Sequence, residues 1–221
     1  MNAMDTVISE ETKSLVEEYL DAASNLYGIA PLSKILSIYN SQNEPLSEDD
    51  FLSIVDNIMK KHKFFSIVAE DEFYDDVEKT KPIDRDLVAE YVLTVDDDDY
   101  YYLKGEQYGK PYYVPDKAQF LKYKDEYYHE KTLSFISLRA FLRNRSGLSK
   151  EDADYLAEDL YGMADVYEGD VGEAVNYIQQ RTKDHFPEND VKAFIPLFID
   201  MFNDTRLQVN RGFTANEIKA F

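Results

Sequence analysis

The chain has 221 residues and carries 44 Asp and Glu against 24 Lys and Arg, which gives a formal net charge of −20. A surface this negative repels phosphate backbones, whose neutralisation by Lys and Arg provides most of the non-specific affinity for nucleic acids. The sequence has no cysteine, which excludes disulfides, zinc–thiolate sites, iron–sulfur clusters and cysteine nucleophiles.

The first part of the chain predicts helices with recognisable ends. Apolar residues at helical spacing indicate a helix from Glu10 to Tyr27, and Gly28 suits the position after its end. Pro31 is placed for the first turn of a second helix over residues 31–40. Ser47 with Asp50 resembles a capping arrangement that opens a third helix over about residues 48–61.

Residues 64–76, FFSIVAEDEFYDD, contain two aromatic or β-branched runs around an acidic turn. This pattern is typical of a β-hairpin. Three helices followed by a hairpin is the order of elements in a winged-helix protein, so we expect residues 1–80 to form a winged-helix-like domain.

Residues 81–115 are expected to be a tyrosine-rich connector, because glycine, proline and tyrosine cluster near its end. Within it, residues 84–94 fit either a short helix or a strand. The run Asp96–Asp99 lacks the spacing and the glycine of an EF-hand, so a solvated loop is favoured over a calcium or magnesium site.

Residues 116–221 predict a helical bundle, so the expected fold class is mainly α with a minor β hairpin. The candidate helices run near residues 116–129, 133–144, 150–166, 171–184 and 189–206. Their start signals are Asp116, Thr132, Ser149, Asp170 and Asn189. Pro196 should kink the last of them or displace its start. Thr214 and Glu217 form a capping box that predicts one more short helix.

The third predicted helix has the wrong charge for reading DNA, so direct nucleic-acid binding is disfavoured. Its solvent-facing positions are expected to be Asp49, Asp50, Ser53, Asp56, Asn57, Lys60 and Lys61. The three histidines, His62, His129 and His185, are far apart and form no metal-binding pair. No nucleotide-binding or hydrolase motif is present, so we expect no metal, no cofactor and no catalytic residues.

Two groups of residues are candidates for contact with a partner or ligand. Tyr108, Tyr112 and Tyr113 belong to the tyrosine-rich connector, where rings could fill a seam between domains or line a cleft. Arg139 and Arg143, with Arg145 nearby, form the densest basic patch. Arginines at this place either compensate the dipole at the end of a helix and form internal salt bridges, which we favour, or bind an anion or partner.

Three segments resemble known sequences: residues 19–55 (YLDAASNLYGIAPLSKILSIYNSQNEPLSEDDFLSIV), 109–128 (GKPYYVPDKAQFLKYKDEYY) and 203–218 (NDTRLQVNRGFTANEI). They are similar to uncharacterised proteins of Gram-positive bacteria, some of which carry a C-terminal Cys/His metal-binding motif called SEC-C. The resemblance implies the two-part architecture and supplies no activity. This chain ends where the SEC-C motif would begin and has no cysteine, so zinc binding is not expected to carry over.

We therefore expect a non-enzymatic protein–protein interaction or adaptor module whose partner is another protein of basic charge. One alternative is a nucleic-acid-associated regulator that uses Lys60–Lys63 and the three arginines, or a DNA mimic. Another is an enzyme with its site at the tyrosine-rich connector. The sequence shows neither a secretory signal nor a stretch of about 18 apolar residues, so a soluble, cytoplasmic protein without membrane contact is expected.

Overall fold

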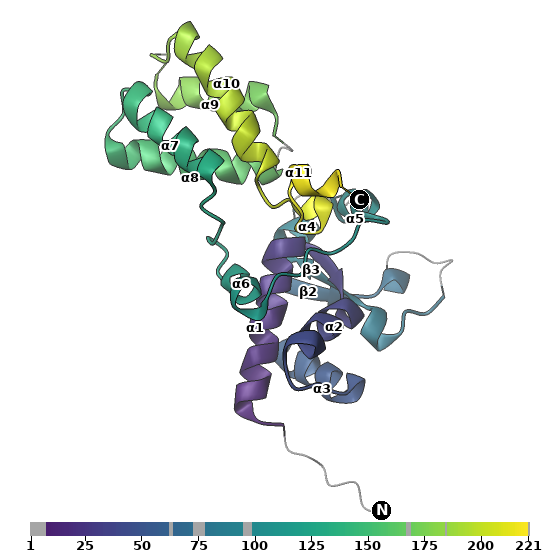
Figure 1. Ribbon diagram of the computed structural model, residues 1–221. Coiled ribbons are helices and arrows are strands. Elements are labelled where there is room, and N and C mark those ends of the chain that lie inside the picture. Colours follow the sequence, from purple (N-terminus) through teal and green to yellow (C-terminus); the bar gives the residue numbers. More distant parts are fainter. Residues whose placement is uncertain are drawn as a thin grey trace, which may run out of the picture. The chain divides into compact units, whose positions relative to one another are not determined.

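The chain divides into two units, Met1–Tyr128 and His129–Phe221, each with its own hydrophobic core (Figure 1). A computed structural model describes residues 8–61, 64–72, 78–94, 99–166, 169–183 and 185–220. The described residues are mainly helical and include one small antiparallel sheet. The prediction of a mainly α protein with a minor β component is therefore confirmed.

The first unit begins with α1 (Glu10–Tyr27), α2 (Leu32–Gln42) and α3 (Glu48–Ile58). Local caps explain these ends. The side chain of Ser9 accepts a hydrogen bond from the backbone N–H of Thr12 at 3.1 Å, and Gly28, with φ 67°, ends α1. Ser47 caps α3 in the same way, through the N–H of Asp50. The bounds of α1 are as predicted, whereas α3 ends three residues earlier than expected.

Three short strands form the sheet, in the order β1 (Ile29–Pro31), β3 (Asp86–Ala89), β2 (Phe65–Val68). Both pairs are antiparallel, with Ile29 opposite Val88 and Phe65 opposite Ala89. The expected hairpin needs correction here. Its first run is β2, but the partner of β2 is β3, which lies in the segment that fitted either helix or strand. Residues 73–77 of the expected second arm lie outside the described residues.

The expected connector contributes regular elements to the first unit. Around β3 lie η2 (Pro82–Asp84), α4 (Glu90–Thr94) and α5 (Asp99–Gln107), while η1 (Glu70–Glu72) follows β2. Farther on are α6 (Lys117–Phe120) and η3 (Leu121–Lys124), where one long helix was predicted. The boundary between the two units falls after Tyr128, not near residue 115.

A buried ionic cluster fixes α5 to the central strand. Asp86 is 7% exposed and accepts hydrogen bonds at 2.9 Å from the Tyr100 hydroxyl and from the Lys104 ammonium. Burial and the Asp86 carboxylate raise the pKa of Tyr100. Burial opposes the charge on Lys104, but its hydrogen bonds to Tyr100 and Asp86 outweigh this and raise its pKa. Both partners are protonated at neutral pH, so Asp86 pairs with one cation and one neutral hydroxyl.

The described residues of the second unit form four longer helices and two short elements: α7 (Leu133–Arg145), α8 (Lys150–Val166), α9 (Val171–Arg181), α10 (Glu188–Asn203), η4 (Gln208–Asn210) and α11 (Ala215–Ile218). Thr132, Ser149 and Asp170 cap α7, α8 and α9 as predicted. Asn189 does not start α10, which begins at Glu188 after Pro187. Pro196 lies inside α10 and does not displace its start.

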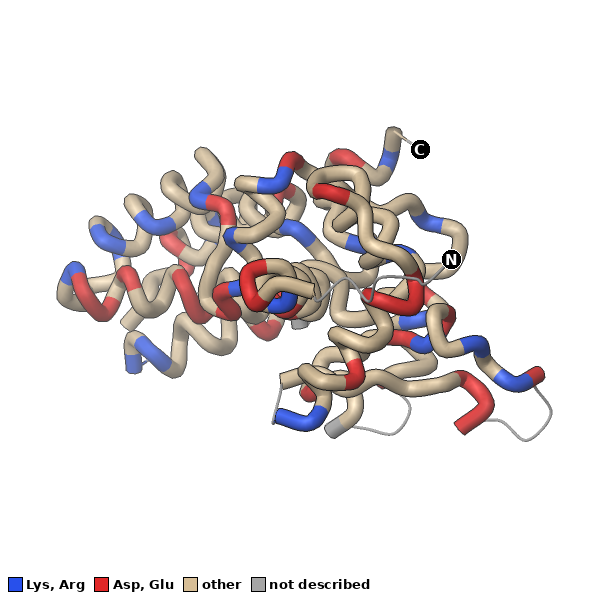
Figure 2. The backbone as a smooth tube through the Cα atoms, turned by 90° about the horizontal axis from the view of Figure 1, so that it is seen from below, with Lys and Arg blue, Asp and Glu red and all other residues tan. Residues whose placement is uncertain are grey.

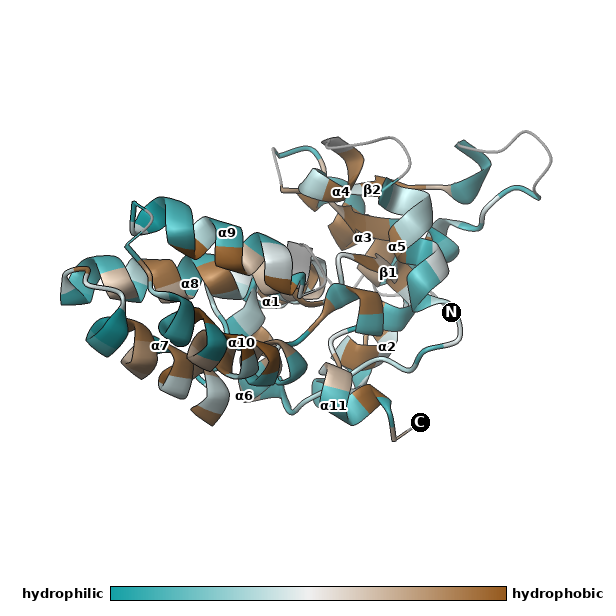
Figure 3. Ribbon diagram, turned by 90° about the horizontal axis from the view of Figure 1, so that it is seen from above, coloured by the Kyte–Doolittle hydropathy of each residue, from teal (hydrophilic) through white to brown (hydrophobic). Residues whose placement is uncertain are grey.

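Each unit buries its own apolar face. In the first, Tyr19, Tyr27, Phe51 and Phe120 are among the largest fully buried side chains; in the second, Phe135, Phe194 and Phe198 are. Hydrophobic and hydrophilic positions alternate along α8 and α10, as expected for amphipathic helices (Figure 3). The tyrosine-rich stretch packs on the first core, because Tyr112 and Tyr113 contact it.

Candidate functional site

The solvent face of α3 is acidic. The seven positions predicted to face solvent are all exposed, which confirms that prediction. Glu48, Asp49 and Asp50 form the first turn, where negative charge is favourable for the helix dipole. Asp56, in the last turn of α3, lies 3.4 Å from Arg85, and both side chains keep contact with solvent. The face therefore presents four carboxylates and one compensating guanidinium.

The negative charge is concentrated in the first unit. Residues 1–128 carry 28 Asp and Glu against 13 Lys and Arg, whereas residues 129–221 carry 16 against 11. The formal charges are therefore −15 and −5. Figure 2 shows the acidic and basic positions along the backbone. Long-range attraction of a cationic partner would act mainly on the first unit.

The first unit also contains a hollow of about 360 Å³, within the size range of ligand and side-chain pockets. Two exposed rings line it, Phe64 at 71% and Tyr127 at 84% exposure. We call this feature the aromatic hollow, and its other lining residues are Asp21, Ser24, Asn25, Phe65, Lys124, Asp125 and Glu126.

Hydrogen bonds hold the backbone around the aromatic hollow. The Phe64 carbonyl accepts from the N–H of Glu90 at 2.8 Å, which extends the pairing of β2 with β3. The N–H of Tyr127 donates to the Asp125 carboxylate at 3.0 Å, in a turn that directs the ring into solvent. The Asn25 amide donates to the Tyr123 carbonyl at 2.8 Å and joins α1 to η3. The backbone at each ring therefore takes part in a hydrogen bond with another residue of the first unit.

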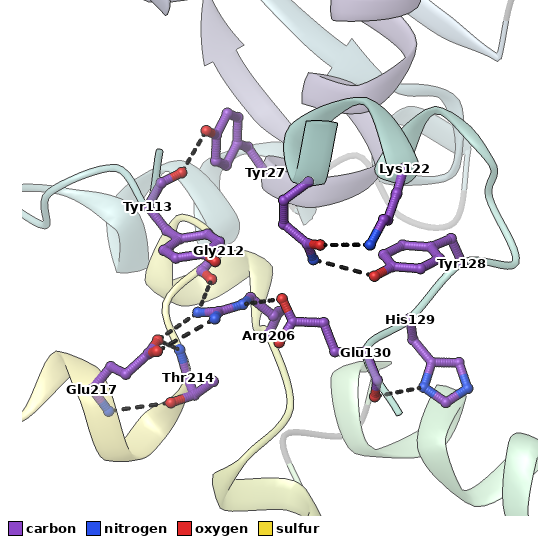
Figure 4. Close-up of polar contacts among 11 residues, drawn as sticks. Tyr27, Tyr113, Lys122, Tyr128, His129, Glu130, Arg206, Gly212, Thr214 and Glu217 are labelled. Carbon is purple, nitrogen blue, oxygen red and sulfur yellow. Dashed lines mark hydrogen bonds and ion pairs between the residues drawn. The ribbon is translucent and has the colours of Figure 1, made fainter. Parts of the chain in front are cut away.

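The three tyrosines predicted as contact residues do not form one site. Tyr108 is 87% exposed. Tyr112 packs edge-on against Tyr27 with ring centroids 5.0 Å apart, and the Tyr113 carbonyl accepts the Tyr27 hydroxyl at 2.7 Å (Figure 4). Tyr112 and Tyr113 therefore dock the chain after α5 onto α1. None of the three lines the aromatic hollow.

The predicted arginines belong to the second unit and have intramolecular partners. Arg143 makes a two-pronged hydrogen bond to Asp154 at 2.6 and 2.5 Å. Arg139 lies 5.8 Å from the centroid of the Phe135 ring. Arg145 lies 3.9 Å from Asp190. Arg143 and Arg145 thus form internal salt bridges, as the favoured interpretation expects, whereas the contact of Arg139 is with an aromatic ring.

A buried histidine forms an ionic cluster in the second unit. Nε2 of His129 lies 2.5 Å from both the Glu158 carboxylate and the Lys131 ammonium, and its ring stacks on Tyr161 at 3.9 Å. Burial lowers the pKa of His129. Burial opposes ionisation of Glu158, but hydrogen bonds from Lys131 and His129 outweigh it and lower its pKa. The His129 side chain is 6% exposed, so this acid–base group has little access to a substrate.

Arg206 joins the beginning and the end of the second unit. Its side chain is 10% exposed and contacts Glu130 at 3.3 Å and Glu217 at 2.5 Å (Figure 4). It also donates to the Gly212 carbonyl at 3.2 Å. Glu217 completes the predicted capping box with Thr214 at the start of the short helix α11. The same Glu217 carboxylate binds Arg206, which connects α11 to the rest of the second unit.

The other sequence candidates give no second site. Asp96–Asp98, His62 and Lys63 lie outside the described residues. Over the described part of the chain, no group of three or more His, Cys, Asp or Glu is placed to hold a metal ion. In that same part, no helix is both long and apolar enough to cross a membrane.

No protein-family model, curated protein or solved structure matches the chain. The resemblance to proteins with a SEC-C motif therefore stays a prediction. The sequence analysis identified the acidic face of α3 but missed the aromatic hollow. Its one sequence signal was Phe64, an aromatic residue placed directly before the buried Phe65 at the start of a strand.

Proposed function

We propose that the chain is a protein-interaction or adaptor module, with a winged-helix-like first unit and a small helical bundle as its second. The order α1, β1, α2, α3, β2, β3, with β3 in the middle of the sheet, supports the winged-helix description. The two separate cores support two independent units.

The charge of α3 is the observation that carries the proposal. In helix-turn-helix proteins that read DNA, the recognition helix lies in the major groove and its neighbours contact phosphates. The corresponding face here exposes Glu48, Asp49, Asp50 and Asp56. Phosphates would be repelled from it, whereas Lys and Arg side chains would be attracted. A basic segment of another protein is therefore the partner that this surface fits.

The nucleic-acid alternative finds less support. It needs Lys60–Lys63 and the arginines of α7 to form one open basic face. Lys61 lies 3.8 Å from Glu17, and Arg143 is held by Asp154. A DNA mimic remains a special case of the proposal, in which the basic partner is itself a nucleic-acid-binding protein that DNA displaces.

Quantitative affinity capture from native lysate tests the proposal. Three baits are compared. The first is the wild-type chain, and the second is the α3 variant, with Glu48→Gln, Asp49→Asn and Asp56→Asn. The third is a control variant with Glu44→Gln, Asp84→Asn and Glu106→Gln. Both triple variants remove three exposed negative charges, but only the first changes α3. We expect basic proteins on the wild type and the control at about 0.05 M salt, fewer at about 0.3 M, and few on the α3 variant.

Two results would contradict the proposal. One is that the α3 variant retains the same proteins as the control, which would show that only total charge matters. The other is that the wild type retains no protein at either salt concentration.

A further inference from the structure

We propose that the aromatic hollow binds an arginine side chain of the basic partner. This inference rests on the proposed function, and it assigns a specific contact to a surface away from the sequence-predicted residues. It begins from the exposure of Phe64 and Tyr127. Large exposed rings that line a hollow are typical of binding surfaces.

The charge around the hollow selects a cation. Three carboxylates line it, from Asp21, Asp125 and Glu126. Among the described lining residues there is one lysine, Lys124, which lies 3.0 Å from Glu18 on α1. The described lining residues therefore include more acidic than basic side chains, in a unit whose formal charge is −15. An anionic ligand would meet carboxylates at this site, which disfavours its binding.

The combination of rings and carboxylates favours guanidinium over ammonium. A guanidinium is planar, stacks on aromatic faces and is weakly hydrated, and its edge can donate two parallel hydrogen bonds to a carboxylate. A lysine ammonium can also lie over a ring, but it loses more hydration on leaving water. Both kinds of group line the hollow: the rings of Phe64 and Tyr127 and the carboxylates of Asp125 and Glu126.

The test uses the full chain, labelled with ¹⁵N for NMR, and three short Gly/Ser peptides that differ at two positions. These positions hold arginine, lysine or citrulline, the neutral analogue of arginine. We expect the arginine peptide to shift the amide signals of Phe64, Phe65 and Tyr127, the lysine peptide to bind more weakly, and the citrulline peptide to leave them unchanged.

Two variants make the test specific. Phe64→Ala with Tyr127→Ala removes both rings, and because both are exposed the fold should persist. Phe64→Tyr with Tyr127→Phe keeps them and is the control. We expect the first to weaken binding of the arginine peptide at least fivefold and the second to bind as the wild type does, since each cation–ring contact contributes about two- to fivefold at exposed sites.

The inference is overturned by equal shifts with citrulline, by shifts that do not involve the hollow, or by equal binding to the double-alanine variant. The outcome is separable from the proposed function. If α3 proves necessary for capture of basic proteins while the hollow binds no arginine, the proposed function stands and the inference fails. If the hollow binds arginine but no partner is captured, the site stands and the proposed function fails.

Discussion

Replacing Gly169 with alanine should destabilise the second unit more than a simple change of backbone preference would. Gly169 has φ +74°, a conformation that costs other residues about 1–2 kcal/mol. A Cβ there would lie 2.6 Å from the ring of Phe202 on α10, closer than two non-bonded carbon atoms can approach. Such overpacking forces side chains and backbone to shift, which typically lowers the free energy of unfolding by a further amount of about 1–3 kcal/mol. We therefore expect Gly169→Ala to lower the free energy of unfolding by about 2–5 kcal/mol.

Gly147 is the matched control for this substitution. Its φ is +71°, but a Cβ there would meet no atom within 4 Å. Gly147→Ala should therefore lower the free energy of unfolding by only about 1–2 kcal/mol, the contribution of the positive φ alone. Urea unfolding followed by circular dichroism measures both variants. In a Phe202→Leu background, the excess cost at Gly169 should largely vanish, because the two sites are directly coupled. Equal costs at the two glycines would refute the close packing of Phe202 on Gly169.

Two further predictions concern the ionic clusters of the second unit. Burial lowers the pKa of His129, so the unfolded chain binds a proton at this imidazole more readily than the folded chain does. The contribution of neutral His129 to the free energy of unfolding is therefore fully present above about pH 6.5 and decreases as the pH falls below that value. Urea unfolding at a series of pH values should show this loss, and a His129→Gln variant that keeps the full slope between about pH 6.5 and 5 would contradict it. Arg206→Gln should remove the ion pairs with Glu130 and Glu217 and lower the free energy of unfolding by about 1–3 kcal/mol. It should also open residues 207–220 to proteolysis before residues 10–58, as read by mass spectrometry, and unchanged cleavage would contradict the role of Arg206.

Local signals allowed much of the helical structure to be predicted. Ser9 and Gly28 at the ends of α1, and Thr214 with Glu217 at α11, act within a few residues of the element that they cap, so the sequence alone reveals them. The strands of the sheet could not be predicted in this way, because each strand pairs with a segment that is distant in the sequence. β1 is three residues long and becomes a strand only by pairing with β3, more than 50 residues away along the chain.

The same distinction applies to the candidate surfaces. The acidic face of α3 follows from helical periodicity, so its exposed residues could be predicted. The aromatic hollow is assembled from α1, the start of β2 and residues 124–127, and no local pattern links these segments. Tyr112 and Tyr113 were identified as contact residues from composition, but their contacts are with Tyr27 of α1, which the fold alone brings near.

Equilibrium binding of two labelled probes tests the central claim most directly. The full chain is titrated against a short peptide rich in lysine and arginine and against a short DNA duplex, at about 0.15 M salt. The acidic face of α3 predicts binding of the peptide, weakened by Glu48→Gln, Asp49→Asn and Asp56→Asn, and no binding of the duplex. Binding of the duplex more tightly than the peptide, or peptide binding that is unchanged in the α3 variant, would contradict the claim that this surface recognises a basic protein.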